Sequence, residues 1–135
     1  QAHNALASGK DPQRMGSAHP NLVPYRAFEA KDGWFVIGVG SDNQWANLCE
    51  LMSIENRAEW HTNAGRIAER AVIESIVGKI VAGYSRMELE ELLAGIPCAP
   101  VNTITEALDD KQSIARELVT EYNGVEVLAS PLRFY

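Results

Sequence analysis

Three consecutive stretches in the middle of the chain, residues 42–52, 63–82 and 85–96, carry apolar residues at the helical spacing i, i+3, i+4 and i+7. Each stretch therefore predicts an amphipathic helix with one face in a core. Asn63 is the predicted N-cap of the second helix, and Ser85 with Glu88 forms a capping-box pattern at the start of the third. The positions expected to be buried are Trp45, Leu48, Cys49 and Met52, then Ile73, Ile76, Val77, Ile80 and Val81, and finally Leu89, Leu92, Leu93 and Ile96.

Strand-forming runs lie on either side of these helices. Residues 25–30 and 34–39 flank Lys31-Asp32-Gly33, and a short connection that contains Asp-Gly is typical of a β-hairpin. The second run, WFVIGV, has no polar alternation, which predicts a central strand covered on both faces. Near the C-terminus, Asn123-Gly124 between two apolar runs predicts a second hairpin, over residues 118–128.

Glycine and proline mark the segments outside these elements. Residues 1–9 are compatible with a helix that stops at Gly9, and the three prolines in residues 11–24 predict an extended, irregular segment. The two prolines of residues 96–101, IPCAPV, exclude a regular central strand and favour an extended edge segment. Short helices are expected from Arg57 to His61, from Thr103 or Thr105 to Leu108, and from Ser113 to Glu117.

Strands near both ends with helices between them predict an α+β fold, with a small, mainly antiparallel sheet and several helices packed on it. A chain of 135 residues is long enough to bury a real core. This order of elements does not alternate strand and helix as nucleotide-binding α/β folds do.

The stretch from Asp32 to Trp45, DGWFVIGVGSDNQW, is the strongest candidate for a ligand site. A strand, a loop containing Gly38 and Gly40, and a helix start with Ser41 or Asp42 as N-cap can bring backbone N–H groups to a ligand. The stretch matches neither GxGxxG nor the P-loop pattern. A bulged strand end followed by an ordinary helix cap explains the same residues, and local sequence favours that explanation.

Composition narrows the functions further. The net charge is −6 and the basic residues are scattered, which argues against nucleic acid or an anionic membrane as a partner. No apolar run reaches the roughly 20 residues of a membrane span. Cys49 and Cys98 lie in apolar surroundings without a CxxC pattern, and the chain starts without a secretory signal, so we expect reduced thiols and a cytoplasmic location.

The residues give little support for chemistry of their own. His3, His19 and His61 are far apart and lack metal-ligand spacing, so no metal site is expected, and His19 before Pro20 is interpreted as a hydrogen-bonding residue. No serine stands in a G-x-S-x-G pattern. Asp109 and Asp110 are neighbours, which diverge on a helix, and are interpreted as a solvated helix end.

Several unusual segments, in their order along the chain, resemble the class III coenzyme A transferases of the formyl-CoA transferase and carnitine CoA-transferase type. They cover nearly the whole chain: His19-Pro20 with Pro24-Tyr25, Asp32-Gly33, Asn43-Gln44-Trp45, Gly95-Ile96-Pro97 with Ala99-Pro100-Val101, Gln112 with Ala115-Arg116, and Ser130-Pro131-Leu132. The resemblance implies that residues 16–135 are the small domain of such an enzyme. Residues 1–15 would be the end of a large-domain helix and a linker.

The same resemblance implies an activity that this chain does not carry alone. Family members move coenzyme A between carboxylic acids through an aspartate nucleophile in the large domain, and no aspartate here stands in that motif, so no catalytic residue is expected and the chain alone should be inactive. The implied partners are the acyl-CoA and acid substrates, the large domain, and a second copy in a homodimer. Coenzyme A thioester is implied as substrate, with no tightly bound cofactor.

By similarity, the small domain supplies a glycine-containing loop over the acyl site, which maps onto Gly38, Gly40, Ser41, Asp42, Asn43 and Gln44. Where some members have consecutive glycines, this chain has GVGSDNQ, which predicts a stiffer, polar lid. Asn43 and Gln44 are the amides expected nearest the acyl group, although either could face solvent in a first helical turn. Two other interpretations stay open: a stand-alone, non-enzymatic module that binds a small acid or a protein, and a racemase of 2-methylacyl-CoA thioesters.

Overall fold

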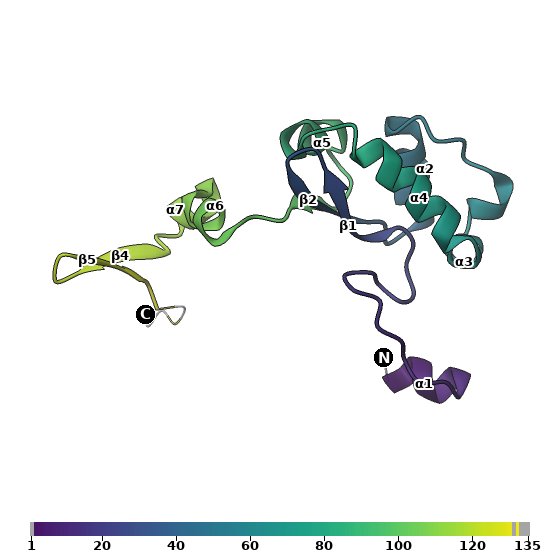
Figure 1. The fold of residues 1–135 in the computed structure, drawn as a ribbon, viewed down its shortest axis with the longest axis horizontal. Coiled ribbons are helices and arrows are strands. Elements are labelled where there is room, and N and C mark those ends of the chain that lie inside the picture. The colour runs from purple at the N-terminus through teal and green to yellow at the C-terminus, as the bar shows by residue number, and fades with distance from the viewer. Residues whose placement is uncertain (1, 131, 133–135) are drawn as a thin grey trace. The chain divides into compact units, whose positions relative to one another are not determined.

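The chain forms two compact units, residues 1–101 and 102–135, and the computed structural model describes residues 2–130 and 132 (Figure 1). The first unit contains a three-stranded sheet and most of the helices, and the second contains two short helices and a hairpin. All strand pairs are antiparallel. The fold is therefore α+β, as the order of elements predicts.

The sheet of the first unit has the order β1-β2-β3. Strands β1 (Tyr25–Ala30) and β2 (Gly33–Gly38) form the predicted hairpin, with Phe28 opposite Phe35. Strand β3 (Cys98–Pro100) pairs with β2 from the other side. The central position of β2 and the edge position of the proline-containing segment are both confirmed.

The prediction that β2 is covered on both faces is wrong. Phe35 and Ile37 are fully buried, whereas Trp34, on the opposite face, is 50% exposed and Val36 is only partly buried. Helices α2, α4 and α5 gather on one side of the hairpin, and the apolar residues of the other face have no covering layer among the described residues of this unit (Figure 1). Apolar composition alone cannot distinguish a strand buried on both faces from one with an open apolar face.

Three helices supply the core that lies against the sheet: α2 (Asp42–Leu51), α4 (Arg70–Val81) and α5 (Arg86–Leu92). Most predicted core positions are confirmed, with Ile76, Ile80 and Leu92 only partly buried at its edge. Ser85 and Glu88 form the predicted capping box of α5. The Glu88 carboxylate accepts a hydrogen bond from the Ser85 backbone N–H, and this hydrogen bond lowers the pKa of Glu88.

The single helix predicted over residues 63–82 is two helices, α3 (Asn63–Ala68) and α4, with a break at Glu69. The Glu69 carboxylate accepts a hydrogen bond from the Trp60 indole at 3.3 Å. Thr62, rather than Asn63, caps α3, because the Asn63 side chain binds the backbone of Asn21 and Val23 instead. These contacts join residues far apart in sequence, so helical periodicity does not reveal them.

The other elements of the first unit follow the sequence closely. Helix α1 (Ala2–Ser8) ends at Gly9, whose φ is +67°, and a 3₁₀ helix, η1 (Ala58–Trp60), occupies the predicted short turn. Residues 11–24 contain no helix or strand. Gly95, expected to end the third helix, lies two residues after Leu93, the C-cap of α5, and its φ is +96°.

The second unit contains helices α6 (Ile104–Asp109) and α7 (Lys111–Ala115) and strands β4 (Val119–Tyr122) and β5 (Val125–Leu128). Thr103 caps α6, one of the two predicted caps. Helix α7 begins two residues before its predicted start because the Asp110 side chain caps it. The predicted hairpin is confirmed, and Asn123 and Gly124 at its turn both have positive φ, at 52° and 78°.

Within the described part of the chain, no helix is long and apolar enough to cross a bilayer.

Candidate functional site at the start of helix α2

A reciprocal capping box fixes the loop between β2 and α2. The Ser41 hydroxyl accepts a hydrogen bond from the Gln44 backbone N–H at 3.2 Å. The Gln44 amide oxygen accepts from the backbone N–H groups of Gly40, at 2.7 Å, and Ser41, at 3.2 Å. Both N–H groups and both side chains are therefore engaged within the loop itself, which makes it a stiff helix start.

Arg66 of α3 ties the same loop to two other segments. Its side chain is fully buried, and its Nη2 lies 2.9 Å from Oδ1 of Asp42. Nε donates to the Val23 carbonyl at 2.8 Å and Nη1 to the Trp60 carbonyl at 2.9 Å. The guanidinium also lies over the Trp45 ring, 5.5 Å from its centroid. A buried cation is tolerated here because its donors meet oxygen acceptors.

Gly38 lies close beneath the Tyr25 ring. A Cβ at residue 38 would stand 3.3 Å from the nearest ring atom, a tight contact that the ring would have to relieve by a small shift. Neither Gly38 nor Gly40 has a positive φ, so neither position needs glycine for a left-handed backbone. The absence of a side chain at residue 38 therefore gives the Tyr25 ring room next to the loop.

His19 stacks on Tyr25 and thereby reaches the same edge of the sheet. The ring centroids lie 5.3 Å apart with 26° between the planes, and the His19 backbone N–H donates to the Tyr25 carbonyl. Nδ1 of His19 accepts from the Asn21 backbone N–H at 3.1 Å, which leaves the ring proton on Nε2 in the neutral imidazole. The expected role of His19 as a hydrogen-bonding residue agrees with this arrangement.

Two polar groups at this edge have no partner among the described residues. They are the Asn43 side-chain amide, which is exposed at the first turn of α2, and Nε2 of His19, which is partly buried. Both can donate a hydrogen bond to a carbonyl or carboxylate oxygen without carrying a charge. Each of these two groups can thus donate a hydrogen bond to an acyl oxygen.

The structure brings all six predicted loop residues together but gives them different partners. Ser41, Asp42 and Gln44 are engaged in the cap and the ion pair, whereas Asn43 is free to meet a ligand. Sequence reasoning missed Tyr25 and Arg66 as part of this region. Nothing in the sequence marks Arg66 as buried, since a basic residue in a helix is normally solvated. For Tyr25, the only sign in the sequence was the glycine at residue 38, next to which its ring lies.

A separate cleft of about 430 Å³ lies at the open edge of β1, and no predicted loop residue lines it. Arg26 crosses it to Glu74 at 2.9 Å, and Arg70 approaches the other oxygen of that carboxylate at 3.1 Å. The two cations therefore already share one anion. Across residues 2–130 and 132, no group of three His, Cys, Asp or Glu side chains is arranged to hold a metal ion.

The two cysteines are free thiols in different environments. Burial raises the pKa of Cys49 to about 11, with a smaller opposing effect of Arg66, and burial and nearby Glu90 raise the pKa of Cys98.

A thiol-reactive dye at pH 8 is expected to label partly buried Cys98 slowly and buried Cys49 only after urea unfolding. Cys98→Ser should abolish labelling of the folded protein, and rapid labelling of two thiols would contradict this prediction.

This fold occurs in a known enzyme family. The model of CoA-transferase family III matches residues 1–134, and the chain belongs to that family. A succinyl-CoA:mesaconate CoA-transferase from Haloarcula hispanica is 37% identical over 133 residues, which cover 93% of this chain and 34% of that protein. A succinate–glutarate CoA-transferase from Agrobacterium fabrum is 32% identical over 123 residues, which cover 87% of this chain and 31% of that protein.

Solved structures agree with the sequence relatives. A CAIB/BAIF family protein from Brucella suis is 38% identical with a TM-score of 0.85, and the match covers 99% of this chain and 37% of that one. A Mycobacterium tuberculosis protein, Rv3272, has a TM-score of 0.73 at 20% identity over 84% of this chain, which shows the shared fold alone. The chain spans about a third of the length of the curated relatives.

Proposed function

We propose that this chain is the small-domain part of an enzyme that transfers coenzyme A between carboxylic acids. The observation that carries the proposal is the 37% identity, over 93% of this chain, to a CoA-transferase that is about three times as long. In this proposal residues 16–135 are the small domain, and residues 1–15 are the end of a large-domain helix and its linker. The large domain and a second copy in a homodimer are its partners, and the cytoplasm its location.

The chemistry proposed for the complete enzyme runs through an aspartate outside these 135 residues. Its carboxylate attacks the acyl-CoA thioester carbonyl, which forms a mixed anhydride and expels the CoA thiolate. The thiolate then attacks the aspartyl carbonyl, which releases the first acid and leaves an aspartyl-CoA thioester. The acceptor carboxylate reverses both steps: it displaces the thiolate to form a new anhydride, and the thiolate attacks the acceptor's acyl carbon to give the new acyl-CoA and free aspartate.

The role proposed for this chain is a stiff, polar lid over the acyl group, formed by Gly38, Gly40, Ser41, Asp42, Asn43 and Gln44. The capping box and the Asp42–Arg66 ion pair support stiffness, because they fix the loop before any ligand arrives. Asn43 is the residue proposed to meet an acyl or carboxylate oxygen, and the lack of another partner for its amide supports this. His19 Nε2 is a second donor at the same edge.

The test compares this chain with the complete product of its gene. The 135-residue chain alone is expected to give no exchange between succinyl-CoA and an acceptor dicarboxylate, and the complete product is expected to turn over. Exchange by the isolated chain would contradict the proposal, since the proposal places the nucleophilic aspartate outside these 135 residues. No exchange by the complete product, with binding of the acid alone, would favour the non-enzymatic module.

In the complete product, Asn43→Ala is expected to lower kcat/KM about tenfold, the loss of one hydrogen bond worth about 1.4 kcal/mol. Asn47→Ala is the matched control, because Asn47 is an exposed asparagine one turn further along the same helix. Equal effects of the two substitutions would remove Asn43 from the proposed site.

A further inference from the structure

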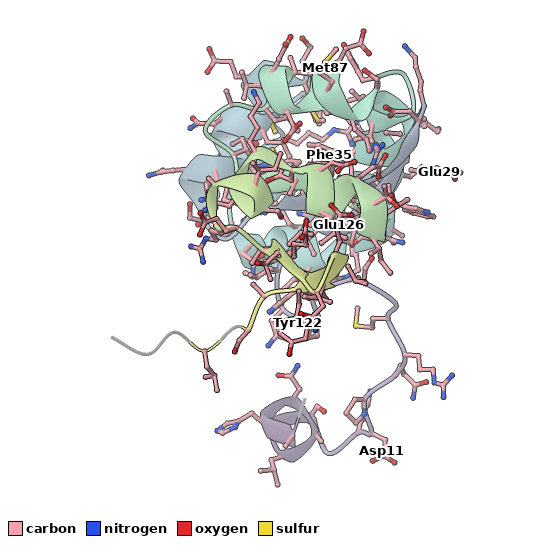
Figure 2. The ribbon with its side chains drawn as sticks, turned by 90° about the vertical axis from the view of Figure 1, so that its left-hand side faces the viewer. Asp11, Glu29, Phe35, Met87, Tyr122 and Glu126 are labelled. Carbon is pink, nitrogen blue, oxygen red and sulfur yellow. The ribbon has the colours of Figure 1, made fainter. Side chains whose placement is uncertain are left out.

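The hairpin of the second unit has a clear difference between its two faces. In the observed register Tyr122 lies opposite Val125 and Thr120 opposite Val127, so these four side chains share one face. Glu121 lies opposite Glu126 on the other face, together with Val119 and Leu128. Figure 2 shows Tyr122 and Glu126 pointing to opposite sides of the hairpin. The face of Thr120, Tyr122, Val125 and Val127 is called the valine–tyrosine face below.

The valine–tyrosine face is uncovered. Tyr122 is 69% exposed, Val125 61% and Val127 39%. No described residue of the second unit is buried, so this unit supplies no core against which the face could pack. A two-stranded hairpin is at best marginally stable in water, and two like charges directly opposite each other weaken it further. The sequence therefore encodes a hairpin whose stability depends on another surface.

The relatives indicate what that surface is. The family match runs through the hairpin to residue 134, and the Brucella suis structure matches 99% of this chain. Both curated relatives described above are about three times as long as the matched segment. A second copy is a poorer occupant, because three apolar side chains offer far less than the roughly 800 Å² per partner of a stable interface. A surface in the same polypeptide needs less area, since docking within one chain costs no translational entropy.

We propose that the valine–tyrosine face of the β4–β5 hairpin docks on an apolar surface of the two thirds of a family-length polypeptide that lie outside these 135 residues, with Glu121 and Glu126 facing solvent. This inference rests on one part of the proposed function, namely that the 135 residues belong to a longer polypeptide. Docking orders the hairpin, which joins the second unit to the rest of the enzyme.

Hydrogen exchange, followed by mass spectrometry, tests this docking. In the isolated 135-residue chain the amides of residues 119–128 are expected to exchange rapidly, whereas those of β1 and β2 are protected. In the complete gene product the same hairpin amides should exchange about 100-fold more slowly. Val125→Lys and Tyr122→Lys, on the two strands of the valine–tyrosine face, should each restore rapid exchange. Glu126→Lys, at the neighbouring position on the opposite face, should keep the protection.

Rapid exchange of the hairpin in the complete product would overturn the proposal. Protection already present in the isolated chain would also overturn it, and dependence of that protection on protein concentration would identify a second copy as the occupant. Loss of protection in Glu126→Lys alone would assign docking to the other face. CoA exchange measured on the same complete product separates the two proposals, because protection without transfer retains the docking surface and rejects the function.

Discussion

Replacing Arg66 by methionine is expected to lower the free energy of unfolding by about 2–6 kcal/mol. The substitution keeps the apolar stem of the side chain but leaves the carbonyls of Val23 and Trp60 buried without their donors. Each unsatisfied buried acceptor costs about 1–3 kcal/mol. Urea unfolding followed by tryptophan fluorescence measures the change, since Trp45 and Trp60 lie next to the guanidinium and its acceptors.

Asp42→Asn is the control for the charge of the same ion pair. The Asp42 side chain is 54% exposed, so solvent screens its interaction and we expect a loss below about 1 kcal/mol. Equally large losses for Asp42→Asn and Arg66→Met would show that the ion pair, rather than the two carbonyl contacts, holds these segments together. The same pair of variants in the complete gene product would show whether a looser loop changes CoA transfer.

Leu48→Ala is expected to cost about 2–5 kcal/mol, because Leu48 is fully buried and its removal leaves a cavity in the core. Leu51→Ala is the matched control: the same substitution, on the same helix, at a side chain that is 37% exposed. That control should cost about 1 kcal/mol or less. Similar losses at the two positions, measured by urea unfolding, would contradict the assignment of one buried face to α2.

Local rules account for most of the elements. Ser85-x-x-Glu88 forms a capping box and Asn123-Gly124 forms a hairpin turn because each signal depends on hydrogen bonds or dihedral angles within a few residues. The buried face of α2 follows from helical spacing alone. These are short-range effects, so the sequence contains all the information they need.

The start of α2 shows how far the same reasoning reaches at the candidate site. Either Ser41 or Asp42 could be the cap, and the structure assigns the cap to Ser41 and an ion pair to Asp42. Asn43 stands out only when its neighbours are known to be engaged. Which side chain of the loop is free to meet a ligand therefore depended in part on the contact of Asp42 with Arg66, which lies 24 residues further along the chain.

The sequence by itself determined the fold class, the capping box of α5, the hairpin turns and the buried stripes of the main helices, because those depend on neighbours along the chain. Only the tertiary structure decided that Trp34 faces outward, that Glu69 interrupts a helix, and that Arg66 is buried beneath the candidate loop. Each of these depends on which distant surface lies opposite a residue. Hydrophobic spacing fixes which residues avoid water, but the packing partner determines where they go and which polar groups remain free for function.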